Sequence, residues 1–315
     1  MNTFCTIITS DYIPFAKALF NSLQKYNNSC LIHVLIADND RNFEVTENFH
    51  TISLSEISEN KLFKEIEKKY AYTNSDFFRW SLKPILMRYL LEREFEKVIF
   101  LDPDIYFVGN YNFLFDKLDT SSMLLTPHWS NTDPYFLEES LIYILRNGLF
   151  NAGFVGACKK GIDALKWWAE ACHMNIAKRE ELGIYVDQKY LDVLPVEFPG
   201  VEIVRHRGCN IACWNMNSNK RSMVDGKLLI NNQFEPVFIH FTKDTIRHIL
   251  NLNDYQLRPY LDEYANEFTK QGFQLQELLA GIDIQEKHTI LKKIKRKVLL
   301  KTRLKRWLLK ISKSI

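Results

Sequence analysis

The chain has 315 residues, of which 46% are hydrophobic and 25% are charged, and its formal net charge is +3. This composition is that of a globular protein with one large α/β domain or two small ones, and it excludes a low-complexity chain. The sequence has no run of eighteen apolar residues, no C-x-x-C pair among its six cysteines and no signal-peptide pattern, so it predicts a cytoplasmic protein without a membrane span.

The N-terminal part of the sequence predicts a parallel sheet wound by helices. Strands are expected at 4–9, at the apolar run 31–37 and at 49–54. A helix is expected over about 14–26, because the apolar residues there recur at helical spacing. A strand, a helix and a strand in this order favour an α/β fold.

The turn after the first strand is polar and has two interpretations. Ser10 or Asp11 can cap the following helix, and Pro14 suits its first turn. Alternatively, the turn contacts a nucleotide base and ribose, as the first strand-to-helix turn does in nucleotide-binding sheets.

Two helices are expected before the next strand. Residues 56–70 have the pattern of one charged surface helix, and residues 76–84 lead into a helix that continues through Leu91. Arg79 and Lys83 are four residues apart and would share a helix face. They form either a solvated face or a clamp for a diphosphate or sugar.

The central motif is an apolar strand that ends in two aspartates. Residues 98–101 are all apolar, and Asp102 and Asp104 follow on either side of Pro103. Residues i and i+2 of an extended segment point the same way, and ligands of open α/β sheets bind at the carboxyl ends of the strands. Both carboxylates can therefore hold one hard cation, Mn²⁺ or Mg²⁺, with diphosphate oxygens as further ligands.

This motif is short enough to arise by chance. A second copy, Asp38-Asn39-Asp40, follows the second predicted strand. The residues around each copy must therefore distinguish a site from a loop.

The second half of the sequence adds strands with polar or glycine-rich ends. Strands are expected at 123–128 and 150–156, and the glycines of the latter mark either a bulge or a close approach to a ligand. A core helix is expected over 162–177. Asp187 and Gln188 lie near the positive end of another helix.

Two further elements complete this half. A hairpin is expected across Asp225-Gly226. A last strand over 236–241 ends with His240, which is either an ordinary core histidine or a residue placed at a strand end as Asp102 is.

The end of the sequence is strongly basic. Residues 287–315 contain twelve Lys or Arg and no Asp or Glu, so the remainder is acidic on balance. The apolar residues of this segment fall largely on one side of a helix, which predicts binding to an anionic membrane surface. The alternative is a solvated terminal helix or a disordered tail, and the acidic body disfavours nucleic acid as a partner.

The order of these features resembles glycosyltransferase family 8, a group of nucleotide-sugar enzymes with the GT-A fold, and a set of uncharacterised bacterial glycosyltransferase-like proteins. The likeness covers about residues 4–245. The motifs that carry it are Lys83-Pro84, Phe100-Leu101-Asp102-Pro103-Asp104-Ile105, Phe150-Asn151-Ala152-Gly153-Phe154, Trp167-Trp168, Val186-Asp187-Gln188, Asp192, Pro195, Asn210-Ile211-Ala212-Cys213-Trp214-Asn215 and His240-Phe241.

The resemblance implies a role for each matching residue. Asp102, Asp104 and His240 would hold the metal. The other implied roles are these: nucleoside binding for Thr9, Ser10, Asp11 and Tyr12; contact with the donor phosphates or sugar for Arg79 and Lys83; lining of the sugar pocket for Asn151 and Gly153; binding of sugar hydroxyls for Asp187; and a place beneath the anomeric carbon for Gln188. Asp38 and Asp40 have no counterpart and are expected in a loop.

One position departs from the family pattern. Family 8 usually continues the His-Phe pair with a small residue and a glycine, but here Thr242 and Lys243 follow. Lys243 could bind phosphate as a point charge, or the loop could lie away from the diphosphate.

The resemblance implies a metal-dependent transfer from a nucleotide-diphosphate sugar, such as a UDP-sugar, to a glycan or lipid-linked acceptor in bacterial surface glycoconjugate synthesis. Retention of configuration is favoured, and inversion with Asp187 as the base is the alternative. A nucleotidyltransferase would need a glycine-rich basic loop, which residues 9–14 lack. A non-catalytic sugar-binding protein would not need the paired aspartates.

The expected architecture is therefore an α/β GT-A fold, a Rossmann-like mixed sheet flanked by helices. One catalytic domain would span 1–250, with a donor half at about 1–120 and an acceptor half at about 121–250. A helical extension over 251–286 and the basic amphipathic segment over 287–315 would follow.

Overall fold

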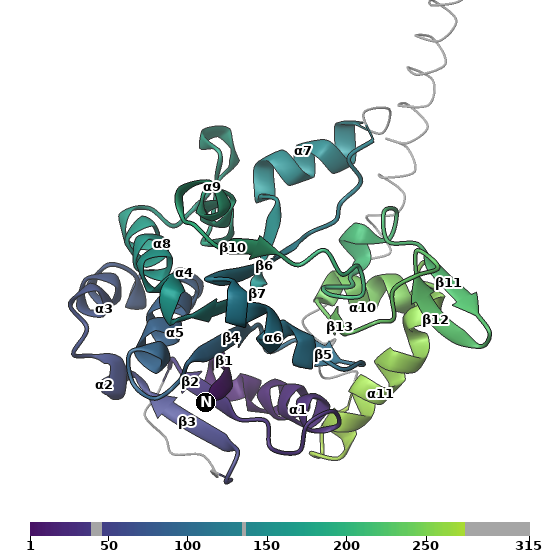
Figure 1. The fold of residues 1–315 in the computed structure, drawn as a ribbon, viewed down its shortest axis with the longest axis horizontal. Coiled ribbons are helices and arrows are strands. Elements are labelled where there is room, and N and C mark those ends of the chain that lie inside the picture. Colours follow the sequence, from purple (N-terminus) through teal and green to yellow (C-terminus); the bar gives the residue numbers. More distant parts are fainter. Residues whose placement is uncertain (39–45, 134–136, 275–315) are drawn as a thin grey trace, which may run out of the picture. The chain divides into compact units, whose positions relative to one another are not determined.

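A seven-stranded mixed sheet organises the part of the chain that the computed structural model describes, residues 1–38, 46–133 and 137–274 (Figure 1). The strand order is β10-β6-β7-β4-β1-β2-β3. Six strands run in one direction and β7 (Phe150–Cys158) runs against its neighbours β4 and β6. The six are β1 (Asn2–Ile8), β2 (Ile32–Ile36), β3 (Phe49–Ser53), β4 (Lys97–Leu101), β6 (Met123–Pro127) and β10 (Val201–Ile203).

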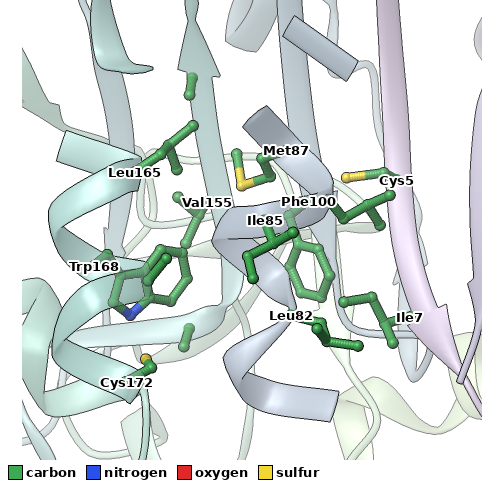
Figure 2. Close-up of a cluster of buried hydrophobic side chains, with 14 of the residues drawn as sticks. Cys5, Ile7, Leu82, Ile85, Met87, Phe100, Val155, Leu165, Trp168 and Cys172 are labelled. Atoms are coloured by element: carbon green, nitrogen blue, oxygen red, sulfur yellow. The ribbon is translucent and has the colours of Figure 1, made fainter. Parts of the chain in front are cut away.

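Helices cover both faces of this sheet, because its central strands, such as β4 and β7, are buried on both sides. In β1, Cys5 and Ile7 pack with α5 (Lys83–Leu91) and α8 (Ile162–Met174), and Figure 2 shows Trp168 and Leu82 in the same cluster. The alternate residues of β1 pack on the other face. There Phe4 and Ile8 meet α1 (Ile13–Gln24) and α6 (Asn112–Thr120).

A small two-stranded sheet brings a late segment of the chain close to the end of β4. β5 (Ile105–Phe107) pairs antiparallel with β13 (Phe238–His240), so His240 lies opposite Ile105. The backbone N–H of Phe241 donates to the carbonyl of Asp104 at 2.8 Å. This pairing places His240 beside the aspartates that follow β4.

After β13, the described residues form two α-helices, namely α10 (Lys243–Leu250) and α11 (Arg258–Thr269). The second of them, α11, packs against α1. The ring of Phe268 lies edge-on to Phe15 at 4.9 Å, and Asn21 of α1 donates to Glu267 at 2.9 Å. Residues Met1–Gly272 form one compact unit, and within the described residues no helix has the length and apolarity needed to cross a membrane.

The single helix expected over 56–70 is wrong. The structure has α2 (Leu54–Ile57), then α3 (Lys61–Ile66), then a π-helical turn (Glu67–Ala71). The side chain of Asn60 accepts hydrogen bonds from the backbone N–H groups of Leu62 and Phe63, so it starts a new helix. The next helix is also divided, into α4 (Ser75–Ser81) and α5.

The helix expected near Asp187 and Gln188 is only a short 3-10 helix (Gln188–Asp192), whereas the expected hairpin is present. The hairpin β11 (Arg221–Val224) and β12 (Lys227–Ile230) turns at Asp225 and Gly226, which both have positive φ. The other elements are α7 (Leu137–Asn147), α9 (Leu194–Glu197), β8 (Lys178–Arg179) and β9 (Ile184–Tyr185). The α/β class with a mixed sheet and flanking helices is confirmed, and the basic segment 287–315 lies outside the described residues.

Candidate active site

Two aspartates and a histidine converge at the carboxyl end of β4. One ligand atom from each of Asp102, Asp104 and His240 lies within 4.8 Å of the others. His240 Nε2 is 2.9 Å from Asp104 Oδ1 and 3.9 Å from Asp102 Oδ2. Carboxylate oxygens with one imidazole nitrogen form a donor set that suits Mn²⁺ or Mg²⁺. The three predicted metal ligands are therefore brought together.

Asp104 and His240 are coupled electrostatically. Burial acts to raise the pKa of Asp104, but the charge and hydrogen bond of His240 outweigh it and lower the pKa. Burial acts to lower the pKa of His240, and Asp104 reverses that shift in turn. His240 Nδ1 has no hydrogen-bond partner among the described residues. The carboxylate of Asp104 thus stays ionised and able to bind a cation.

Gly153 of β7 lies close to side chains of this cluster. A Cβ at this position would lie 2.6 Å from His240 Cε1, 2.7 Å from Asn151 Oδ1 and 2.8 Å from Asp102 Oδ2. Real Cβ contacts are longer, so only glycine fits here without moving these side chains. The close approach at this glycine is to side chains of the candidate site.

A buried lysine links the first aspartate to the second acidic motif. Lys83 begins α5, and its Nζ lies 3.1 Å from Asp102 Oδ1, 3.3 Å from Asp187 Oδ2 and 3.1 Å from the carbonyl of Ala152. Burial acts to lower the pKa of Lys83, but the two carboxylates raise it. Lys83 is therefore a fixed positive charge between Asp102 and Asp187, and it does not share an exposed face with Arg79.

Asp187 is buried beside this lysine at a strained turn. Val186, which precedes it, has a φ of 45°, a left-handed conformation that is unusual for a β-branched residue. Burial raises the pKa of Asp187, and Lys83 only partly offsets this. Its Oδ2 has Lys83 Nζ as an ion-pair partner at 3.3 Å. A carboxylate oxygen can accept more than one hydrogen bond, so Asp187 retains capacity to accept from a ligand hydroxyl.

Gln188 is held at the start of β7 by hydrogen bonds. Its Oε1 accepts from the N–H of Ala152 at 3.2 Å and from the side chain of Asn151 at 3.4 Å, and its Nε2 donates to Asn147 at 2.9 Å. Asn151 Oδ1 in turn accepts from the N–H of Gly153 at 2.9 Å. Gln188, Asn151 and Gly153 therefore form one connected group beside the metal-binding cluster.

The polar turn after β1 points into the same edge of the sheet. Burial raises the pKa of Tyr12, and the charge of Asp104 adds to that rise, so Tyr12 is within electrostatic reach of the cluster. The hydroxyl of Thr9 donates to Asp11. Ser10 donates through its backbone N–H and its hydroxyl to Asp38, at 2.9 and 2.7 Å. Sequence reasoning assigned Asp38 to a loop and missed this contact.

Arg79 and Lys243 lie on elements that border the cluster. Arg79 of α4 forms an ion pair with Asp76, and its Nε is buried without a hydrogen-bond partner among the described residues. The positive charge of Arg79 also acts on Tyr12. Lys243 is the first residue of α10, directly after the capping residue Thr242.

Known proteins resemble the region that contains most of these residues. The model of the family "Glycosyl transferase family 8" matches residues 4–158, which include Arg79, Lys83, Asp102, Asp104 and Gly153. This half of the chain is therefore similar to glycosyltransferase family 8. The mixed sheet with helices on both faces agrees with the α/β architecture expected from the sequence.

Other likenesses cover more of the chain than residues 4–158. The uncharacterized proteins YfnF and YfnD of Bacillus subtilis (strain 168) are each 28% identical, over 76% and 77% of this chain and 81% and 78% of their own lengths. Apo mouse xyloside xylosyltransferase 1 is similar in structure, with a TM-score of 0.48 and 14% identity over 78% of this chain and 99% of that one. Galactosyltransferase LgtC with donor and acceptor sugar analogs gives a TM-score of 0.41 and 16% identity, over 66% and 74%.

His128 and Trp214 lie in this candidate site but were not among the predicted site residues. His128 follows β6, its Nδ1 donates to the carbonyl of Gly148 at 3.0 Å, and its Nε2 lies 3.3 Å from the amide nitrogen of Asn151. Trp214 packs edge-on against both His128 and His240, with ring centroids at 5.8 and 5.4 Å. The polar end of the strand at 123–128 and the Asn210 to Asn215 motif were the available signals.

Proposed function

We propose that this protein is a metal-dependent retaining glycosyltransferase that moves a sugar from a nucleotide-diphosphate sugar, such as a UDP-sugar, to a glycan or lipid-linked acceptor. The observation that carries the proposal is the convergence of Asp102, Asp104 and His240 beside the buried Lys83 and Asp187 pair. Lys83, Asp102 and Asp104 lie within residues 4–158, which the family 8 model matches, and Asp187 and His240 lie beyond them.

The donor would lie along the carboxyl edge of the sheet. The nucleoside would bind at the turn of Thr9, Ser10, Asp11 and Tyr12, because Tyr12 is within electrostatic reach of Asp104. Asp102, Asp104 and His240 would hold Mn²⁺ or Mg²⁺, which as a Lewis acid would stabilise charge on the leaving diphosphate. Arg79 and Lys243 would add positive charge near the phosphates.

The sugar would lie between β7 and the turn at Asp187. The carboxylate of Asp187, whose Oδ2 is ion-paired with Lys83, would accept a hydrogen bond from a sugar hydroxyl. Asn151 and Gly153 would line the sugar pocket, and Gln188 would lie beneath the anomeric carbon. Lys83 would act through Asp102 and Asp187, whose charges it fixes in position, because its three nearest partners are already protein groups.

In the transfer, the bond between the anomeric carbon and the phosphate oxygen breaks, and its electron pair stays on the phosphate. The acceptor hydroxyl oxygen forms the new bond to the anomeric carbon, and its proton passes to the leaving phosphate oxygen. No protein base is needed in this scheme. The ion pair and burial of Asp187 favour a sugar-binding role for it over that of a base for inversion.

The test is turnover of a panel of UDP-, GDP- and CDP-sugars with Mn²⁺, Mg²⁺ or EDTA, with mixed glycoside acceptors. Release of nucleoside diphosphate should require a divalent metal, and NMR of the transferred sugar should show the anomeric configuration of the donor. The Asp102→Asn variant should lose about 100-fold or more of the activity, whereas Asp163→Asn on α8 should not change it. Metal-independent turnover, or a product of inverted configuration, would refute the corresponding part of the proposal.

We also propose that the basic segment 287–315 holds this cytoplasmic enzyme at the inner face of the cell membrane, close to a lipid-linked acceptor. Twelve basic residues could each contribute about 1 kcal/mol near an anionic surface before saturation. Cosedimentation with phosphatidylglycerol vesicles should be lost in a variant truncated after residue 286 and at high salt. Equal binding by both proteins would contradict this role.

A further inference from the structure

Two arginines follow the edge strand of the sheet. Arg205 and Arg207 come directly after β10, which runs parallel to β6. Because β6 and β4 both run against β7, the ends of β10, β6 and β4 meet at one edge of the sheet. Arg205 and Arg207 therefore lie at the edge that contains Asp102 and Asp104.

Their place along that edge separates them from the donor phosphates. The strand order puts β6 and β7 between β10 and β4, and β1 lies on the far side of β4. Neighbouring strands are about 4.8 Å apart, so three spacings separate the end of β10 from that of β4 by roughly 14 Å. The nucleoside turn after β1 is farther still. The ends of β10 and β6 thus lie on the side of β4 away from β1, and Arg207 reaches the tip of β6 at Trp129.

Arg207 is fixed in position by neutral groups. Its guanidinium donates to Asn219 Oδ1 at 3.0 Å, and Asn219 Nδ2 donates back to the carbonyl of Arg207 at 3.3 Å. The guanidinium also stacks on the ring of Trp129, 3.5 Å from its centroid. A buried amide and an aromatic face orient the guanidinium without cancelling its charge.

Neither arginine has an acidic partner. In the described parts of the chain, Arg205 and Arg207 form no ion pair with a carboxylate, whereas the buried Arg221 is paired with Asp254 at 3.0 Å. Burial lowers the pKa of Arg207, and the positive charge of Arg205 lowers it further. Placing two like charges together is unfavourable unless an anion joins them. The two neighbouring positive charges, without a carboxylate partner, therefore favour binding of an anion.

The tip of β6 beside Arg207 has unused hydrogen-bond donors. Trp129 has a φ of 55°, an uncommon conformation for an aromatic residue. Its indole Nε1 and the hydroxyl of Ser130 are buried and have no partner among the described residues, and Ser130 is only 6% exposed. Buried donors are normally satisfied, so these two indicate a ligand at this tip.

We propose that Arg207, assisted by Arg205, binds an anionic group, a phosphate or a carboxylate, on the acceptor substrate. A guanidinium fork matches both of these groups. Trp129 and Ser130 would contact the adjoining sugar. This inference rests on the proposed transferase function, because it assigns these residues to the acceptor.

The test compares matched octyl glycosides by calorimetry: octyl glucoside, octyl glucoside 6-phosphate and octyl glucuronide. Titrations are first run in EDTA, so that no metal can retain the phosphate, and then with saturating UDP and Mg²⁺. The variants are Arg207→Gln and Arg205→Gln. The control is Arg93→Gln, since Arg93 is also stacked on an aromatic ring, that of Tyr89 at 4.3 Å, but precedes β4 at the opposite edge of the sheet.

Wild type should bind at least one of the two anionic glycosides about tenfold or more tightly than octyl glucoside. Arg207→Gln should reduce this preference to within about twofold, Arg205→Gln should weaken it, and Arg93→Gln should leave it unchanged. Comparison of the phosphate and the glucuronide identifies which anion is preferred. Equal binding of charged and neutral glycosides, no binding of either, or a preference that survives Arg207→Gln would overturn the inference. Failure of UDP to bind with metal would instead refute the transferase proposal.

Discussion

Gly153 shows how a single residue fixes the geometry of the site. It separates the side chains of Asp102, Asn151 and His240, and each would lie within 3.0 Å of an added Cβ. Three groups with different roles thus share one space that a methyl group would fill. The lack of a side chain at Gly153 therefore matters to the site as much as the candidate ligand residues do.

The Gly153→Ala substitution should therefore damage the site more than the fold. The new methyl group should push His240 and Asp102 apart, and affinity for UDP with Mn²⁺ should fall by about tenfold or more. The control is Gly226→Ala, where an added Cβ meets no atom within 4 Å but the positive φ strains the hairpin. That variant should lose stability and keep its affinity. Unchanged affinity in Gly153→Ala would mean that the three side chains do not act together.

Two buried histidines predict how stability responds to acid. Burial lowers the pKa of His128 to about 4, and burial followed by the charge of His50 lowers the pKa of His33 to about 4. Both folded values lie below the unfolded value of about 6.5, so the unfolded chain binds more protons between about pH 6.5 and 4. Each histidine should therefore remove about 1.4 kcal/mol of unfolding free energy per pH unit in that window.

The comparison of wild type with His33→Asn isolates this effect. Asparagine can accept the hydrogen bond that Thr3 shares with His33 at 2.9 Å. Urea unfolding at about pH 7 and about pH 5 should show a smaller loss of unfolding free energy in the variant. The reason is that the variant takes up one proton fewer than wild type on unfolding. Raised carboxyl pKa values at Asp187 and Asp254 act in the opposite direction but are common to both proteins. Identical pH slopes would show that His33 titrates normally.

At the scale of elements, sequence patterns predicted strands better than helices. The apolar runs identified β1, β2, β3, β4, β6 and β7, because a strand buried on both faces has no polar positions. The helix expected over 56–70 failed because its charged residues continue through a break at Asn60. That asparagine ends one helical pattern and caps the next, which periodicity alone does not reveal.

The cap at Asn60 has a measurable value. Asn60→Ala removes the acceptor of two backbone N–H groups at the start of α3, so the unfolding free energy should fall by about 1 kcal/mol. Asn60→Asp retains an acceptor and should restore most of this loss. Urea unfolding measures both. If alanine and aspartate were equally destabilising, the side-chain cap would not be the reason that α3 begins here.

The site itself was only partly predictable. Asp102, Asp104 and Gly153 lie within or beside recognisable strands, and the structure brings them together with His240 through the pairing of β5 with β13. The contacts of Asp38 with Ser10, and of Trp214 with His240, join residues far apart in sequence. No local pattern encodes such contacts. They follow from the topology, which sets the order of strand ends along the edge.

At the scale of the whole sheet, function is arranged along one edge. In strand order, the turn proposed to bind the nucleoside follows β1, the aspartates proposed to bind the metal follow β4, the group proposed to bind the sugar begins β7, and the two arginines follow β10. A donor and an acceptor approaching from opposite ends of this edge would meet at Asp102 and Asp187. The antiparallel β7 is what places Asn151 and Gly153 between them.

Calorimetric titration of UDP into the full-length protein, with and without Mn²⁺, tests this account most directly. Wild type should bind UDP only when the metal is present, Asp104→Asn should lose about 100-fold or more of the affinity, and Asp116→Asn on the exposed side of α6 should match wild type. That result would establish that Asp102, Asp104 and His240 hold a metal that recruits a nucleoside diphosphate. Metal-independent binding, or equal affinity in Asp104→Asn, would contradict the account at its centre.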